Sequence, residues 1–174
     1  MSRTPCQGAT PYQLARATLE GKRYHWLITG VAGFVGSNLL ETLLRLGQQV
    51  TGLDNFMTGY RSNLEQVQAL VPTAVWNRFR FIEGDIRCLA SCKDACQGVD
   101  FVLHQAALGS VGRSIADPIL TSDINMIGFL NVLVAARDAC VKRLVYAAQA
   151  RPTATIPTCP RSRSGSGGRC RLMR

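Results

Sequence analysis

Three glycines near the start of the chain have the spacing of a phosphate-binding turn. In the run Gly-Val-Ala-Gly-Phe-Val-Gly, Gly30 and Gly33 have no side chains to obstruct a pyrophosphate, and Gly36 allows a following helix to pack closely. The free N–H groups at a helix start near Phe34 and Val35 would face the anion with partial positive charge. Three glycines can also form an ordinary turn, so this interpretation requires a strand before the motif and a helix after it.

Acidic residues follow two of the expected strands. Asp54 lies 18 positions after Gly36, where a carboxylate can accept hydrogen bonds from the ribose hydroxyls of adenosine. The same charge repels a 2′-phosphate and favours NAD over NADP, although Arg61 keeps NADP open. Asp85 could accept from the adenine amino group while Ile86 packs on the ring. At both acids an ordinary turn aspartate is the alternative.

A further expected strand ends at His104 and is followed by Gln105, Ala106 and Ala107. These small residues would allow a cofactor to lie close to the backbone. His104 by itself is interpreted as a packed structural histidine rather than as a catalytic base.

Three cysteines, Cys88, Cys92 and Cys96, lie four residues apart and would share one face of a helix. A zinc site prefers tighter cysteine pairs and further ligands, and no histidine is close in sequence. We interpret these cysteines as small apolar core residues and expect no metal site.

The elements that must position these residues alternate along the chain. The apolar patterns predict strands at 24–29, 49–53, 79–83, 99–104 and 143–147. They predict helices at 13–20, 34–46, 62–70, 89–96 and 121–139. Alternating strands and helices indicate an α/β fold with a doubly wound parallel sheet, Rossmann-like, with strand order 3-2-1-4-5. The glycine motif lies between the first of these strands and its helix, as a pyrophosphate turn requires.

Composition sets the class of protein. The chain has 174 residues, of which 47% are hydrophobic and 18% charged, which excludes a disordered or collagen-like chain. No run of about 18 uncharged apolar residues is present, so no membrane-crossing helix is expected. The N-terminus lacks a signal-peptide pattern, which favours a cytoplasmic protein whose seven cysteines are reduced.

The positive charge is concentrated at one end. Residues 151–174 contain six arginines and no acidic residue, which is two-thirds of the net charge of +9. We predict an arm with a short helix at 1–23, a folded domain at 24–148 and a disordered basic tail at 149–174. The tail has neither stacking aromatic residues nor a nucleic-acid motif, so specific nucleic-acid binding is not expected. Nonspecific binding of polyanions at low salt stays open.

Taken together, the motifs resemble those of a known family. Thr-Gly-x-x-Gly-Phe-x-Gly at 29–36, Asp-Asn-Phe at 54–56, Thr-Gly at 58–59, Gly-Asp-Ile at 84–86 and Gln-Ala-Ala at 105–107 resemble the extended short-chain dehydrogenase/reductases. Within them, the NAD-dependent epimerase/dehydratase branch is the most similar. The segment 105–118 with Asn125 and 128–131 is similar to UDP-N-acetylhexosamine 4-epimerases of polysaccharide biosynthesis. The likeness covers residues 13–148, which would be the N-terminal half of such an enzyme.

The resemblance implies a role for each matching residue. NAD would be the cofactor, a UDP-sugar the substrate and a homodimer the assembly. Asn125 would support the strand that carries the catalytic residues, while Ser110, Val111 and Arg113 would face the sugar nucleotide. The implied cofactor-binding residues are Gly30, Gly33, Phe34, Val35, Gly36, Asp54, Asn55, Gly59, Asp85, Ile86, Gln105, Ala106, Ala107, Asn125, Ala147 and Ala148.

The sequence departs from the family where the chemistry should begin. In the family a hydride moves from C4 of the sugar to NAD and returns to the other face, with a tyrosine beside a lysine as the base. Tyr-Ala-Ala at 146–148 matches, but Gln-Ala-Arg replaces the expected serines, and no tyrosine or lysine follows Tyr146. We therefore assign no catalytic residue and expect no turnover. A noncatalytic NAD-binding module and the remnant of a related dehydratase or decarboxylase are the alternatives.

A shift of reading frame near residue 149 would account for both the missing residues and the basic tail. With suitable codons for 152–157, reading one base earlier than the codon for Thr153 gives Tyr-Gly-Asp-His-Pro. The same offset over 170–174 gives Ser-Pro-Tyr-Ala. The nucleotide sequence around codon 149 tests this hypothesis, because it should encode Ser-Ser-Thr-Tyr-Gly in another frame.

Overall fold

A computed structural model describes residues 10–148 of the chain. The expected basic tail and residues 1–9 of the expected N-terminal arm therefore lie outside the described residues. The short helix of this arm was expected at 13–20, but helix α1 (Pro11–Glu20) already begins at Pro11. Its start is fixed by a capping box, in which the Thr10 hydroxyl accepts from the Gln13 N–H and the Gln13 side chain accepts from the Thr10 N–H.

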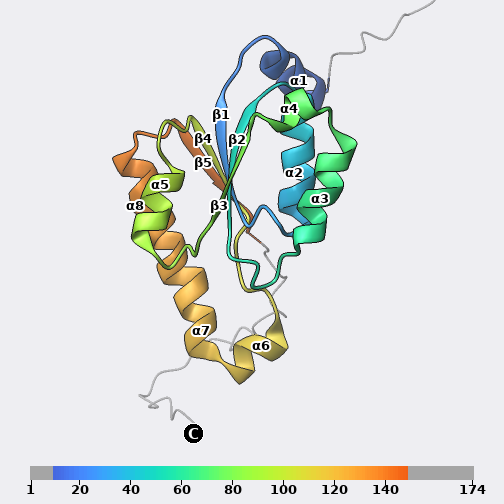
Figure 1. Cartoon of the computed structure of the whole chain (residues 1–174). Helices are drawn as coiled ribbons and strands as arrows, with labels where there is room; N and C mark the ends of the chain where they lie inside the picture. Colours follow the sequence, from blue (N-terminus) through green and yellow to red (C-terminus); the bar gives the residue numbers. More distant parts are fainter. Residues whose placement is uncertain (1–9, 149–174) are drawn as a thin grey trace, which may run out of the picture.

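Five parallel strands form the single sheet of the described domain (Figure 1). They are β1 (His25–Thr29), β2 (Gln49–Asp54), β3 (Phe79–Glu83), β4 (Phe101–His104) and β5 (Arg143–Tyr146). Their order is β3-β2-β1-β4-β5, so the predicted fold class and strand order are confirmed. The strand order changes direction between β1 and β4, because β2 and β3 are added on one side of β1 and β4 and β5 on the other. In such folds, ligands bind in the crevice at this switch point.

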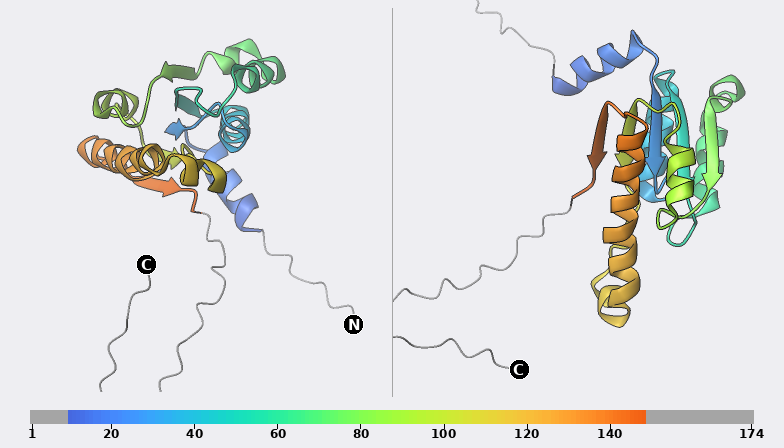
Figure 2. Two further views of the ribbon diagram at one scale, coloured as in Figure 1. Left: turned by 90° about the horizontal axis from the view of Figure 1, so that it is seen from below. Right: turned by 90° about the vertical axis from the view of Figure 1, so that its left-hand side faces the viewer.

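Helices cover both faces of the sheet (Figures 1 and 2). On one face lie α1, α2 (Phe34–Arg45), α3 (Arg61–Leu70) and the short α4 (Thr73–Trp76). On the other lie α5 (Leu89–Ala95) and α8 (Phe129–Asp138). Successive residues of β1 pack on opposite faces of the sheet. Leu27 belongs to the hydrophobic core under α5 and α8, and Ile28 belongs to the core under α2. This is why the strand reads as a continuous apolar run.

The long helix expected at 121–139 differs from the expectation in two ways. It begins earlier, at α7 (Pro118–Ser122), where the Asp117 side chain accepts from the Leu120 N–H. Between α7 and α8, residues Asp123–Gly128 form a π-helical turn, η1. Hydrophobic periodicity does not reveal such a turn, because one additional residue is absorbed without changing the apolar composition. The short helices α4 and α6 (Val111–Ala116) were also missed.

The same helix stands out by its composition. Among the described residues, the 21-residue helix Pro118–Asp138 is the one that is long and apolar enough to cross a membrane, with a mean hydropathy of 1.6 over its most apolar 18-residue window. Ile124, Val132 and Ala135 are nevertheless buried against the sheet. By contrast, Ile119, Met126 and Leu130 have between 53% and 83% of their surface exposed. The sequence-based expectation of no membrane-crossing helix stays a prediction.

Candidate functional site

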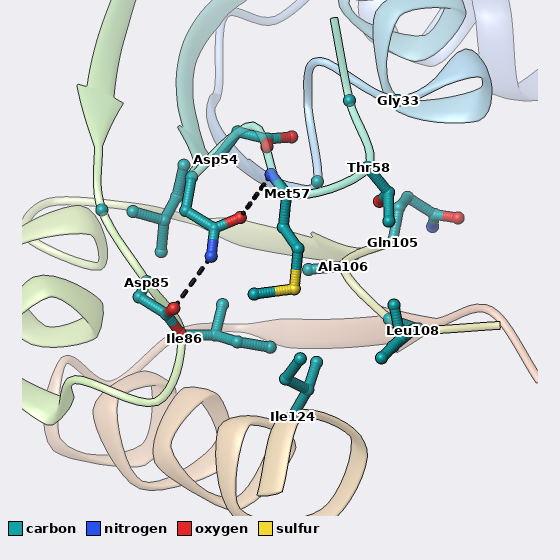
Figure 3. Close-up of a pocket in the computed structure, with 16 residues that line it drawn as sticks. Gly33, Asp54, Met57, Thr58, Asp85, Ile86, Gln105, Ala106, Leu108 and Ile124 are labelled. Atoms are coloured by element: carbon teal, nitrogen blue, oxygen red, sulfur yellow. Dashed lines mark hydrogen bonds between the residues drawn. The ribbon is translucent and has the colours of Figure 1, made fainter. Parts of the chain in front are cut away.

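An open pocket with a volume of about 90 Å³ lies at the carboxyl ends of β1, β2, β3 and β4 (Figure 3). Residues that are far apart in sequence meet here. The alternating strands and helices predicted this meeting, because parallel strands end at the same edge of the sheet. The sequence-predicted residues in its lining are Gly30, Gly33, Asp54, Asn55, Gly59, Asp85, Ile86, Gln105, Ala106 and Ala107. The lining also includes residues without a predicted role: Leu53, Met57, Thr58, Gly84, Leu108 and Ile124.

The turn before α2 exposes backbone rather than side chains to the pocket. Gly33 is the N-cap of α2, and no side chain caps this helix end. Phe34 and Val35 expose 83% and 53% of their surface and do not line the pocket. Of these two residues, only the main-chain N–H groups can therefore serve an anion at this helix start.

Two glycines allow the close approaches that shape this turn. Gly30 has a φ of 71°, and a Cβ atom there would lie 2.7 Å from the Ala106 nitrogen. A Cβ atom at Gly36 would overlap the carbonyl oxygen of Gly30 and lie 2.8 Å from the Val31 Cα. Gly30 therefore keeps β1 and the residues after β4 in contact, and Gly36 brings α2 against the turn.

Asp54 is buried and fixes the turn from the end of β2. Its Oδ2 accepts from the Ala32 N–H at 2.9 Å, and its Oδ1 accepts from the Phe56 N–H at 2.8 Å. Phe56 has a positive φ of 57°, so the second bond supports a strained turn. The carboxylate thus orders the backbone on both sides, in addition to the ribose contact expected from the sequence.

At the far side of the pocket, Asn55 joins two segments. Its Nδ2 donates to Asp85 Oδ2 at 2.8 Å, and its Oδ1 accepts from the Met57 N–H at 3.0 Å (Figure 3). The Met57 side chain projects between Ile86 and Leu108 in the same view. Sequence reasoning missed Met57, although its place next to Thr58 and Gly59 in the Asp-Asn-Phe-x-Thr-Gly run could have drawn attention to it.

His104 is packed beneath the site. Its Nδ1 lies 2.7 Å from the Thr29 hydroxyl, which also accepts from the Ala106 N–H at 3.3 Å. The imidazole stacks on Phe129 with 5.1 Å between ring centroids. Burial lowers the pKa of His104 to about 4, so the ring is neutral at pH 7. These contacts agree with the structural role inferred for His104.

The lowered pKa makes stability depend on pH. An unfolded histidine has a pKa near 6.5, so between pH 6.5 and 4 the unfolded chain binds a proton that the folded chain does not. The free energy of unfolding should fall by about 2 kcal/mol at pH 5 through this group. Urea unfolding at pH 7 and pH 5 should show a smaller acid loss for His104→Gln than for the wild type. Equal losses in both proteins would contradict this assignment.

Several predicted residues lie outside the pocket lining. Asn125 was expected to support the strand that carries the catalytic residues, and this role stays a prediction. Its side chain bonds both backbone groups of Leu108, at 2.8 Å to the N–H and 3.1 Å to the carbonyl. Ser110 caps α6. The exposed residues Val111, Arg113, Ala147 and Ala148 do not line the pocket.

The three spaced cysteines lie around α5. Cys92 and Cys96 are buried in the core, which raises the pKa of Cys92 to about 12 and that of Cys96 to about 11. Cys88 is exposed. Over residues 10–148, no group of three His, Cys, Asp or Glu side chains is placed to hold a metal ion.

The sheet order and the glycine turn define the Rossmann-like class of α/β domains. The family model described as "NAD dependent epimerase/dehydratase family" matches residues 26–151. The chain belongs to this family.

Individual relatives are similar over the same region. A putative UDP-glucose 4-epimerase from Methanocaldococcus jannaschii is 33% identical over 126 residues, which are 70% of this chain and 36% of the relative. A structure of UDP-glucose-4-epimerase from Stenotrophomonas maltophila, with bound NAD and formylated UDP-arabinopyranose, is 32% identical with a TM-score of 0.66. It matches over 73% of this chain and 37% of that chain.

A third relative carries a different sugar in its name. A structure of UDP-N-acetylglucosamine 4-epimerase from Methanobrevibacter ruminantium, in complex with UDP-N-acetylmuramic acid, is 25% identical with a TM-score of 0.67. The match covers 86% of this chain and 45% of that chain. The chain thus spans less than half the length of each of these three relatives.

Proposed function

We propose that the pocket binds NAD. The observation that carries the proposal is the cradle formed by Gly30, where a Cβ atom would fill the space beside Ala106. The pyrophosphate would lie on the backbone N–H groups at the start of α2, where the helix dipole stabilises negative charge. Asp54 and Asn55, with Gly59, would bind the adenosine ribose. Asp85 and Ile86 would bind the adenine.

The preference for NAD over NADP follows from the groups around the ribose position. Asp54 brings a buried carboxylate to this end of the pocket, where a 2′-phosphate would be repelled. Arg61, the one residue that kept NADP open, pairs with Glu83 at 2.6 Å and stacks over Phe56 at 4.2 Å. Its charge is therefore already compensated.

We further propose that the domain derives from a UDP-N-acetylhexosamine 4-epimerase. NAD, when bound, would supply transient oxidation at C4 of the sugar. The residues of this chain would hold the cofactor and, at Ser110, Val111 and Arg113, face the sugar nucleotide. The exposed apolar residues of α7, η1 and α8 are compatible with the homodimer expected from the family.

As a second function, we propose a noncatalytic NAD-binding module. The observation that favours it is the run Gln-Ala-Arg at 149–151, which replaces the serines expected after Tyr-Ala-Ala at 146–148. Groups that position or transfer the proton contribute about a hundredfold to ten-thousandfold to a rate, so a site without them should show little turnover.

One pair of measurements tests these proposals. The purified 174-residue chain should release heat on binding NAD in calorimetry, and it should not convert UDP-N-acetylglucosamine to the galacto epimer with NAD present. Measurable epimerisation would refute the noncatalytic proposal and support the epimerase. No binding of NAD would refute both.

A further inference from the structure

Arg87 supports Asp85 without itself lining the pocket. Its Nη2 lies 2.7 Å from Asp85 Oδ2, and its Nε lies 3.1 Å from each carboxylate oxygen. The Arg87 backbone N–H also donates to Asp85 Oδ1 at 2.8 Å. These hydrogen bonds are the main cause that lowers the pKa of Asp85 to about 2.

The arginine is itself held by the long helix on the other side. Its Nη1 lies 3.5 Å from Asp123 Oδ2 in η1. The Asn131 side chain in α8 donates to the backbone carbonyls of Ile86 and Arg87, at 3.1 Å and 2.8 Å. Backbone and side chain of this segment are thus both fixed, so the direction of the Asp85 carboxylate is set by its neighbours rather than by a free rotamer.

An ionised carboxylate can only accept hydrogen bonds. Asp85 accepts from Arg87 and, at the edge of the pocket, from Asn55, and its side chain is still 24% exposed. The Asn55 bond is the one that a ligand could share or replace. A base with an amino group would donate to the carboxylate, whereas a base with a carbonyl group would present a second acceptor to it.

We propose that Arg87 is a specificity-determining positioning residue, which fixes Asp85 as an acceptor so that the pocket selects a 6-amino purine over a 6-oxo purine. The inference rests on the proposed binding of NAD. Arg87 touches neither base nor sugar in this scheme and acts through Asp85.

The test compares NAD with nicotinamide hypoxanthine dinucleotide by calorimetry on the full chain. A hydrogen bond to a charged acceptor corresponds to about a tenfold to hundredfold difference in affinity, so the wild type should prefer NAD by at least that factor of ten. Arg87→Met should reduce the preference to about threefold or less. Arg87→Lys retains the charge but not the two-pronged geometry, and its preference should be intermediate.

Arg80→Met is the matched control. Arg80 also pairs with an aspartate, Asp94, at 3.0 Å, but on the surface and outside the pocket lining. Its loss should leave the preference unchanged. A folded Arg87→Met or Arg87→Lys protein that binds both ligands more weakly with the wild-type preference would overturn the inference. A wild type that binds both ligands equally would also overturn it while leaving NAD binding intact, whereas binding of neither contradicts the proposed function.

Discussion

Gly36→Ala is expected to abolish measurable NAD binding and to lower the free energy of unfolding by about 3 kcal/mol or more. The added Cβ would overlap the Gly30 carbonyl oxygen, and its next neighbours, Val31 Cα and the Gly30 carbonyl carbon, are also backbone atoms. A side chain could rotate away, but backbone at the turn can move only if α2 separates from β1. That movement would displace the N–H groups proposed to bind the pyrophosphate.

Gly109→Ala provides the control for this substitution. A Cβ at Gly109 meets no atom within 4 Å, so the same chemical change should alter neither stability nor affinity by a measurable amount. Urea unfolding and calorimetry on both variants make the comparison. Near wild-type stability of Gly36→Ala would show that the turn tolerates a side chain and would remove the basis for the cradle.

Asp54→Ala is expected to weaken NAD binding by at least about a hundredfold and to destabilise the fold by about 2 to 5 kcal/mol. The substitution leaves the buried N–H groups of Ala32 and Phe56 without their acceptor. The first of these belongs to the glycine turn, and the second to a residue with positive φ. Loss of both hydrogen bonds would allow the glycine turn and the segment after β2, which both border the pocket, to move.

Two further variants separate the local effect at Asp54 from the loss of any aspartate that accepts from a backbone N–H. Asp54→Asn keeps one acceptor oxygen and should lose about half of the stability difference. Asp100 also accepts from a backbone N–H, that of His25 at 3.0 Å, but at the opposite end of β1. Asp100→Ala should destabilise the protein without changing its relative affinity for NAD. A similar loss of affinity in Asp100→Ala would indicate a general effect of destabilisation.

The sequence predicted the sheet because its determinants are local. Each strand is a short apolar run, and each run is separated from the next by a helical pattern, which allows few topologies. The glycine turn, the acid at the end of β2 and the acid after β3 could be placed for the same reason, since parallel strands end at one edge. Their shared pocket follows from topology rather than from any knowledge of side-chain contacts.

What the sequence could not predict depends on contacts between distant segments. Nothing near Asn125 in the chain indicates that its amide binds the backbone of Leu108. Arg87 follows Asp85 in sequence, yet its second partner, Asp123, lies 36 residues away. Short helices such as α6 contain too few residues to show a periodic pattern.

The π-helical turn η1 determines how far α8 is rotated about the helix axis relative to α7. Within η1, Asp123 contacts Arg87 and Asn125 contacts Leu108, and after it Asn131 binds the backbone of Ile86 and Arg87. Removing one residue from this segment would turn one end relative to the other by about 100°. In evolution, a single-residue insertion or deletion here would therefore disturb both sets of contacts more than many substitutions on the outer surface.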